Sequence, residues 1–175
     1  MEIEAKFKVS DPKKLKKKAE SLGFSLKKKK RQIDTYFIVN KTMPDGTRHY
    51  LRIREDPSKE TVSFDYHRVL SLLETDETEM VISDKDKLVK ILGFLGYKIQ
   101  CVVDKTREQY EKGKITLTFD NVPGLGDFVE VEIEGELNKE NESLINKTIK
   151  DLCLNSKDRV KKKGYPDLLI EAKSA

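Results

Sequence analysis

The sequence of 175 residues has no tryptophan and only two cysteines. Cys101 and Cys153 lie far apart and match no metal or redox spacing, so a disulfide scaffold is not expected and a reducing cytoplasm is the expected location. No stretch approaches the ~20 apolar residues of a membrane-spanning helix. Because acidic residues follow Met1 closely, we also expect no secretory signal and no membrane partner.

Histidine is equally scarce, and neither His49 nor His67 has a serine or cysteine partner in a recognised motif, so a nucleophilic triad is not predicted. Charge is abundant, because 38% of the residues are Asp, Glu, Lys or Arg and 37% are hydrophobic. The formal net charge of +4 is small and does not by itself predict a nucleic-acid partner, which would need a concentrated basic stripe. The length fits one domain, or two very small ones.

Helical spacing of apolar residues predicts three helices, at about Pro12–Leu22, Lys85–Leu95 and Lys139–Leu154. Between them the period drops to two, which predicts about eight strands. Turn signals such as Pro44-Asp45-Gly46 separate these strands. The strands are predicted at Glu2–Val9, Lys27–Val39, His49–Glu55, Thr61–Arg68, Glu77–Ser83, Lys98–Tyr110, Ile115–Asp120 and Phe128–Glu134.

The predicted strands carry like charges in pairs on one face, since residues i and i+2 of a strand point the same way. The pairs are Glu2 with Glu4, Arg52 with Arg54, Glu77 with Glu79, Lys105 with Arg107, and Glu130 with Glu132. Ordinary amphipathic strands with charges toward water are one interpretation. However, paired like charges repel, and a divalent cation or a polyanion would relieve them. A barrel with these faces inward and its apolar faces under helices is the second interpretation; its carboxylates would suit Mg²⁺ or Mn²⁺.

Glu2-Ile3-Glu4-Ala5-Lys6 resembles the Glu-x-Glu-x-Lys signature that opens the CYTH domain, also called the triphosphate tunnel metalloenzyme superfamily. Class IV adenylyl cyclases, thiamine triphosphatases and inorganic triphosphatases belong to that superfamily. Further segments resemble the family in order along almost the whole chain. They are Gln32–Phe37, Leu51–Arg54, Glu77 and Glu79 with Asp84, Lys105–Arg107, Asp120–Glu132 and the tail Tyr165–Leu169.

The resemblance implies an α+β fold, with an eight-stranded antiparallel β-barrel as a polar triphosphate tunnel and helices packed outside, in a single domain over residues 1–175. It also implies a cofactor, Mg²⁺ or Mn²⁺, and a possible homodimer. The implied metal ligands are Glu2, Glu4, Glu130 and Glu132. The implied substrate-binding residues are Lys6, Arg52, Arg54, His67, Lys105 and Arg107. The implied catalytic residues are Lys6, Arg52, Arg54, Glu77 and Glu79, the last two near the metal or the attacking water.

One position departs from the family pattern. The family's fourth basic strand usually ends in a lysine, whereas His67 stands there in this chain, followed by Arg68. Either His67 supplies a weaker, pH-dependent phosphate contact, or Arg68 turns inward through a bulge. An ordinary surface histidine is the third interpretation.

The favoured function is metal-dependent hydrolysis of a triphosphate-containing substrate, with inorganic tripolyphosphate releasing orthophosphate, because hydrolysis needs fewer specific parts than cyclisation. ATP and thiamine triphosphate are the other candidate substrates. One alternative is a class IV adenylyl cyclase that makes cyclic AMP and pyrophosphate from ATP. The second alternative is a non-catalytic polyphosphate- or RNA-binding module that uses the basic runs Lys27–Arg31 and Lys161–Lys163. The inward glutamates disfavour it, since without metal they would repel the ligand.

Overall fold

The computed structural model describes residues 1–39, 47–59 and 61–174, so the predicted turn Pro44-Asp45-Gly46 lies outside the described residues. The strands confirm the predicted pattern closely. They are β1 (Glu2–Val9), β2 (Ser25–Phe37), β3 (Arg48–Asp56), β4 (Thr61–Val69), β5 (Glu74–Ile82), β6 (Ile99–Lys112), β7 (Ile115–Val122), β8 (Gly126–Glu134) and the short β9 (Arg159–Val160). The fifth strand begins earlier than predicted because the Ser71 side chain accepts the backbone N–H groups of Leu73 and Glu74 and forms a turn there.

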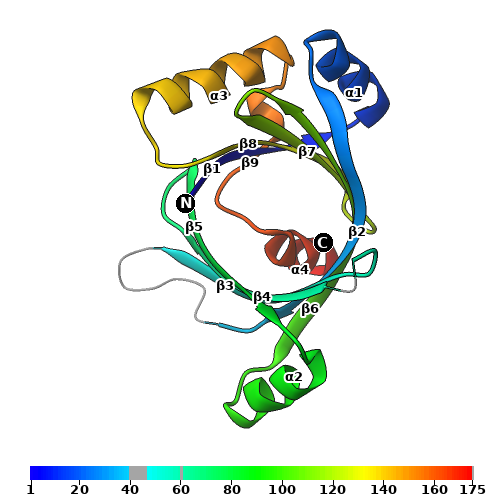
Figure 1. The fold of residues 1–175 in the computed structure, drawn as a ribbon, viewed down its shortest axis with the longest axis vertical. Helices are drawn as coiled ribbons and strands as arrows, with labels where there is room; N and C mark the ends of the chain where they lie inside the picture. The colour runs from blue at the N-terminus through cyan, green and yellow to red at the C-terminus, as the bar shows by residue number, and fades with distance from the viewer. Residues whose placement is uncertain (40–46, 60, 175) are drawn as a thin grey trace.

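The strands form a closed antiparallel barrel, as Figure 1 shows in a view along its interior. Their order is β5-β4-β3-β2-β6-β7-β8-β1-β9, and a pairing of β5 with β1 at Glu2–Thr75 closes the ring. β9 adds two residues to the other end of β1. The prediction of an eight-stranded antiparallel barrel is confirmed, with β9 as an unpredicted addition.

The apolar faces of the strands point outward and are covered by helices. On one side, α1 (Pro12–Ser21) and α3 (Lys139–Asp151) cover a buried cluster that includes Phe7 and Ile133. On the other side, α2 (Lys85–Phe94) covers a second cluster around Ile53. Burial of apolar side chains drives this packing. The charged faces are therefore left inside the barrel, as the second interpretation of the pattern predicted.

The three predicted helices are confirmed, with ends one to three residues shorter than predicted. Each begins with a side chain that accepts a backbone N–H of the first turn, which satisfies a group that has no partner inside the helix. These N-caps are Asp11, Asp84 and Asn138. Gly23 follows α1 with a φ of 91°, a conformation that favours glycine.

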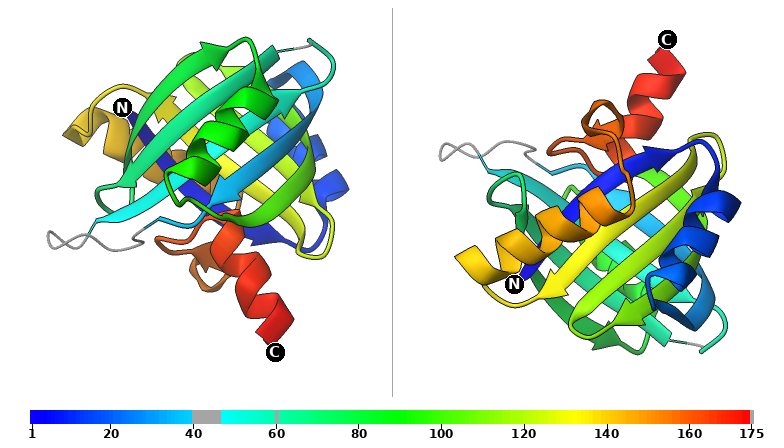
Figure 2. Two further views of the ribbon diagram at one scale, coloured as in Figure 1. Left: turned by 90° about the horizontal axis from the view of Figure 1, so that it is seen from below. Right: turned by 90° about the horizontal axis from the view of Figure 1, so that it is seen from above.

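Besides β9, two more C-terminal elements were not predicted, a 3₁₀ turn, η1 (Ser156–Asp158), and the helix α4 (Tyr165–Ser174). Figure 2 shows α4 projecting from one end of the barrel. Its first residue, Tyr165, is 3% exposed, and its hydroxyl donates to Asp120 at 2.8 Å. The start of α4 therefore covers one end of the interior.

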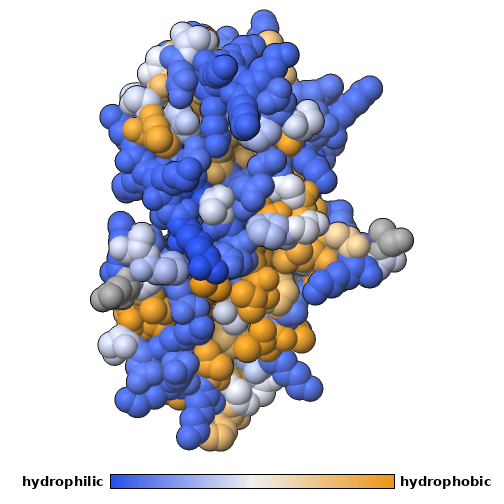
Figure 3. Space-filling view, turned by 90° about the vertical axis from the view of Figure 1, so that its right-hand side faces the viewer, coloured by the Kyte–Doolittle hydropathy of each residue, from blue (hydrophilic) through white to orange (hydrophobic). Residues whose placement is uncertain are grey.

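Apolar side chains also gather on the outer surface. Figure 3 shows them on the lower half of one face, over α2 and the neighbouring strands. The exposed large hydrophobic residues of this region include Ile91, Phe94, Leu95, Ile99 and Val102. Among the described residues, no helix has the length and apolar character needed to cross a membrane.

Candidate active site

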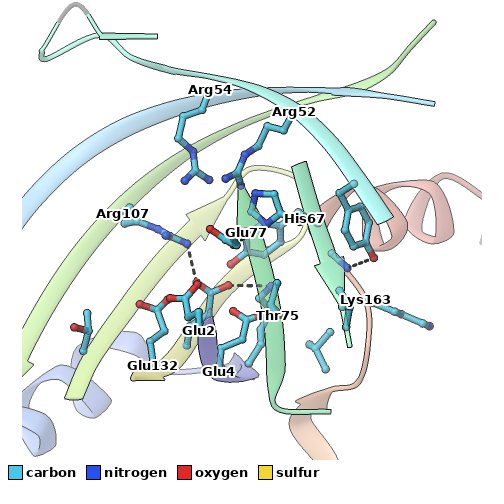
Figure 4. Close-up of a pocket in the computed structure, with 18 of the residues that line it drawn as sticks. Glu2, Glu4, Arg52, Arg54, His67, Thr75, Glu77, Arg107, Glu132 and Lys163 are labelled. Carbon is cyan, nitrogen blue, oxygen red and sulfur yellow. Dashed lines mark hydrogen bonds and ion pairs between the residues drawn. The ribbon is translucent and has the colours of Figure 1, made fainter. Parts of the chain in front are cut away.

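The barrel interior holds a cavity of about 420 Å³. The structure brings every predicted site residue to its lining. These residues are Glu2, Glu4, Lys6, Arg52, Arg54, His67, Glu77, Glu79, Lys105, Arg107, Glu130 and Glu132. Figure 4 shows the arrangement, with Arg52 and Arg54 on one wall, the carboxylates across from them, and Arg107 reaching toward the carboxylates.

One wall carries a carboxylate trio, formed by Glu4 of β1 with Glu130 and Glu132 of β8. One oxygen from each lies within 4.8 Å of the others. The trio forms because β1 and β8 are antiparallel neighbours and Glu4 lies opposite Glu132. The Thr118 hydroxyl donates to Glu132 at 2.9 Å and orients it from β7.

The trio is electrostatically strained without a counter-ion. Burial raises the pKa of Glu132 well above its ordinary range, and the charges of Glu2 and Glu130 add to this. Burial raises the pKa of Glu4 as well. A bound divalent cation would relieve the repulsion, and three oxygen donors are the ligands that Mg²⁺ and Mn²⁺ prefer.

Glu2, the fourth predicted metal ligand, is not part of the trio. It precedes Glu4 on the same face of β1 and lines the same cavity. Burial and the nearby charge of Glu4 raise the pKa of Glu2 to about 8. The Glu2 carboxyl is therefore close enough to feel the negative charge of the trio, and it lies at the edge of this acidic group.

The opposite wall carries Arg52 and Arg54 of β3, each held by a buried aspartate. Arg54 donates Nε and Nη2 to the two oxygens of Asp34 at 2.7 and 2.9 Å. Arg52 donates Nε to Asp65 at 2.8 Å. These contacts use one edge of each guanidinium, which has five N–H donors in a fixed plane. Arg52 Nη1 also lies 3.5 Å from the Tyr36 hydroxyl, and the other N–H donors are available for a phosphate in the cavity.

Arg107 of β6 repeats this arrangement nearer the carboxylates. Its Nε and Nη2 bind Asp120 at 2.7 and 2.6 Å, and Nη2 also contacts Glu130 at 2.7 Å. Lys6 Nζ lies 2.9 Å from the other oxygen of Glu130. Although burial opposes ionisation, Lys6 and Arg107 hold the pKa of Glu130 well below its ordinary range. Glu130 thus joins the basic and acidic parts of the cavity.

Lys105 is the most enclosed cation of the site, with 2% of its side chain exposed. Its Nζ lies 3.5 Å from Asp34, 3.4 Å from Asp120 and 4.9 Å from the ring centre of Tyr165. Burial and the neighbouring Arg107 lower the pKa of Lys105 to about 8. An anion in the cavity would favour its charged form.

The structure decides the alternative between His67 and Arg68. β4 pairs with β3 and β5 without a bulge, so Arg68 points outward to its ion-pair partner Asp76. His67 points inward, 8% exposed, and its Nδ1 lies 2.6 Å from Glu77. The interpretations as an inward Arg68 and as a surface histidine are therefore wrong.

Glu79 lines the cavity at a different point from the trio. It lies opposite Asp65 in the β4–β5 pairing. Burial and the charge of Asp65 raise its pKa. The structure therefore places Glu79 beside an aspartate that holds Arg52, and the expectation of a position near the metal finds no support in the described contacts.

Some side chains of the two basic runs, Lys27–Arg31 and Lys161–Lys163, point into the cavity and others point outward. Lys28 and Lys30 line the cavity, as alternation along a strand requires. Lys29 and Arg31 point outward and pair with Glu108 and Asp104 of β6. From the second run, Lys162 and Lys163 line the cavity beside the start of α4.

Sequence reasoning assigned no role to the three aspartates that hold the arginines. Asp34, Asp65 and Asp120 are each at most 1% exposed. A signal was present, since each aspartate interrupts a strand otherwise rich in apolar or aromatic residues. Their partners could not be named, because the pairs Asp34–Arg54 and Arg107–Asp120 depend on strand register. Tyr165 was not assigned a role either, because its position beside Asp120 and Lys105 depends on how the start of α4 packs against the barrel.

Comparisons with known proteins agree with this geometry. A model of the CYTH domain family matches residues 1–163. A Methanocaldococcus jannaschii protein with a provisional adenylate cyclase name is 33% identical over 171 residues, 96% of this chain and 98% of that protein. The solved PH1012 protein of Pyrococcus horikoshii OT3 is 29% identical, with a TM-score of 0.86 over 97% of this chain and 99% of that one.

A more distant structure shows that the fold is shared widely. The Hippeastrum protein HpAC1, studied as an adenylyl cyclase and described as having a dominant triphosphatase activity, is 15% identical to this chain. It matches with a TM-score of 0.67 over 98% of this chain and 96% of that one. At this identity the likeness concerns the fold alone.

Proposed function

We propose a function for this chain from the premise that it belongs to the CYTH family. The family consists of divalent-metal-dependent enzymes that act on triphosphate-containing substrates. We infer that this chain hydrolyses such a substrate, with inorganic tripolyphosphate favoured and orthophosphate released. The single observation that carries the proposal is the cavity with an arginine wall facing a carboxylate trio.

The basic side chains of the cavity suit a polyanion better than a single phosphate. Arg52, Arg54, Arg107 and Lys105 line one continuous cavity from β3 and β6. Each arginine can offer further N–H donors after binding its aspartate, and arginine matches phosphate oxygens in bidentate fashion. We expect these residues to bind successive phosphates and to stabilise the negative charge that develops during transfer.

The carboxylate trio supports the proposal of a divalent metal ion. We expect Glu4, Glu130 and Glu132 to hold Mg²⁺ or Mn²⁺, with Glu2 as a further ligand from the same strand face as Glu4. When bound, the ion supplies positive charge to the phosphate oxygens and lowers the pKa of a bound water. A polyphosphate binder without catalysis has no use for such a cluster, which would repel its ligand.

The test is a metal-dependent assay of the purified chain with tripolyphosphate, ATP and thiamine triphosphate offered separately. Orthophosphate, pyrophosphate and cyclic AMP are quantified in each case. We expect orthophosphate chiefly from tripolyphosphate. Cyclic AMP with an equal amount of pyrophosphate from ATP would instead establish the cyclase that the name of the M. jannaschii relative suggests.

Glu4→Gln removes one charge from the trio and should lower metal-dependent turnover by at least about 10²-fold. Glu142→Gln, on the exposed first turn of α3, is the matched control and should keep full activity. If no substrate is turned over and Glu4→Gln binds tripolyphosphate as tightly as the unchanged chain, the binding-module alternative replaces the proposal.

A further inference from the structure

His67 and Glu77 form a pair in the cavity wall. The ring lies between Arg52 and Glu77 (Figure 4), and Nδ1 is 2.6 Å from the Glu77 carboxylate. The other ring nitrogen, Nε2, is buried and has no hydrogen-bond partner among the residues that the structure describes. A buried polar atom without a partner costs free energy, and at a site it is a sign of a ligand or reactant that completes it.

The surroundings fix which ring nitrogen carries the proton. Although burial opposes ionisation, the hydrogen bond from His67, the charge of its ring when protonated and the charge of Arg52 lower the pKa of Glu77 to about 2. The Glu77 carboxylate, 2.6 Å from Nδ1, therefore accepts a hydrogen bond from this nitrogen. In the neutral ring, Nε2 then presents a lone pair. Burial first and Arg52 second lower the pKa of His67, which keeps the ring neutral.

The charged groups around the ring come from three strands. Arg52 faces it from β3, Asp65 from β4 and Glu77 from β5. Arg52 disfavours a protonated ring, whereas the two carboxylates favour it. Asp65 is itself engaged by Arg52 at 2.8 Å. The ring is thus poised to accept a proton during a reaction and to share the resulting charge with Glu77.

The other nitrogen-containing side chains that line the cavity cannot accept a proton while they are charged. The guanidinium groups of Arg52, Arg54 and Arg107 have only N–H donors and stay protonated. The trio carboxylates are assigned to the cation, and Glu130 is already bound by Lys6 and Arg107. His67 Nε2 is therefore an uncommitted acceptor beside the place where the arginines would hold a phosphate chain.

We propose that His67, oriented by Glu77, is the catalytic proton acceptor of this tunnel. This inference rests on the proposed triphosphatase function. The oxygen of the attacking water bonds to the terminal phosphorus, and the bond from that phosphorus to its bridging oxygen breaks. The bridging oxygen leaves with the electron pair, as part of pyrophosphate. The proton of the water passes to Nε2, and the ring returns it to solvent after the products leave.

The role is specific to histidine at this position. A lysine there would offer only donors at neutral pH and could bind phosphate without accepting a proton. Glu77 acts as a positioning residue, since it selects the tautomer in which Nε2 is free. General-base catalysis of this kind typically contributes about 10²–10⁴ in rate.

The experiment measures kcat and KM for tripolyphosphate with saturating Mn²⁺ between about pH 5 and about pH 9. The variants are His67→Gln, His67→Lys and Glu77→Gln. His49→Gln is the matched control, because His49 is buried on β3 and contacts Thr47 and Tyr66 outside the cavity lining. Circular dichroism and melting temperature establish that each variant is folded.

We expect both His67 variants to lower kcat by about 10²–10³-fold while KM stays within about threefold. A protonated ring cannot accept a proton, so the activity of the unchanged chain should fall as the pH falls below the ordinary histidine value of 6.5. That acid limb should be absent from His67→Gln. Glu77→Gln should lower kcat by about tenfold or more, because the ring loses its fixed orientation.

Two results would overturn the inference while the triphosphatase stands. One is a kcat of His67→Gln within about threefold of the unchanged chain. The other is full recovery of kcat in His67→Lys, which would make position 67 a phosphate contact. Should His67→Gln fail to fold, the pH profile of the unchanged chain and the Glu77→Gln variant still test the proposal. If Glu77→Gln has the same acid limb and the same kcat as the unchanged chain, the assignment of His67 and Glu77 is wrong. If the unchanged chain turns over no triphosphate, the proposed function fails and this inference fails with it.

Discussion

Replacing Asp34 with asparagine tests whether buried aspartates hold the arginine wall in place. Asp34 has no exposed side-chain surface, and both its oxygens bind Arg54, at 2.7 and 2.9 Å. Lys105 and Arg52 lie 3.5 and 3.7 Å away. The substitution keeps the shape of the side chain and removes its charge, which leaves buried cations without their common counter-charge.

The expected loss of stability follows from this burial. Removing one partner of a buried ion pair costs about 3–5 kcal/mol, and the lower end applies because the asparagine oxygen still accepts one hydrogen bond. In a chain of this size about 1 kcal/mol shifts the melting temperature by about 2–4 °C. We therefore expect Asp34→Asn to melt about 6–12 °C lower than the unchanged chain.

The pH of the measurement matters. Although burial opposes ionisation, Lys105 and Arg54 hold the pKa of Asp34 well below its ordinary value of 3.8. A lowered carboxyl pKa means that the stabilisation is fully present above the ordinary pKa and is lost as the pH falls toward the lowered one. Calorimetric melting at pH 7, with and without tripolyphosphate and without metal, is therefore the assay.

Tripolyphosphate should restore part of the loss, since its charge replaces that of Asp34. We expect the ligand to raise the melting temperature of the variant more than that of the unchanged chain. The control is Asp104→Asn, which breaks a bidentate pair with Arg31 between β2 and β6 at the surface and should have little effect. A stability loss below about 1 kcal/mol in Asp34→Asn, or a smaller ligand effect than in the unchanged chain, would refute this reasoning.

Two further predictions concern the cation and the metal side of the cavity. The lowered pKa of Lys105, about 8, means that the charge of the empty site falls as the pH rises through that value, so calorimetric affinity for tripolyphosphate should weaken above about pH 8. Lys105→Arg, which stays charged, should reduce that weakening, and the remainder comes from Glu2, whose pKa is also about 8 and whose negative charge appears over the same range; an unchanged profile would contradict the assignment. Thr118→Val removes the hydroxyl that donates to Glu132 at 2.9 Å, so titration with Mn²⁺ should show an affinity about 10–100-fold lower; equal affinity would show that Glu132 needs no such support.

The sequence alone determined which residues share one face of each strand. Alternation along a strand sets the face of each side chain relative to its neighbours, so Glu2, Glu4 and Lys6 had to share one face. The apolar alternate residues had to be covered, and the predicted helices supply the cover. These are local properties, and the eight strands and three helices could therefore be predicted with small errors at their ends.

The tertiary structure alone decided which charges meet. Register brings Asp34 to Arg54 and Asp120 to Arg107 across residues that are far apart in the chain. It also places Glu79 beside Asp65 and leaves Glu2 at the edge of the trio. The alternating pattern of a strand excludes a shift by one residue, which would turn every side chain to the other face, but it does not choose between alignments that differ by two residues.

The positions of the C-terminal tail and of His67 also depended on contacts that only the folded barrel provides. The tail resembled the family, yet its structure as α4 and the position of Tyr165 over Lys6 and Lys105 depend on packing against the finished barrel. The inward direction of His67 was likewise one of three sequence interpretations until the unbroken β4 pairing selected it. The sequence set the chemical groups available to the cavity, and long-range pairing set their partners, because only the folded chain brings opposite charges within hydrogen-bond distance.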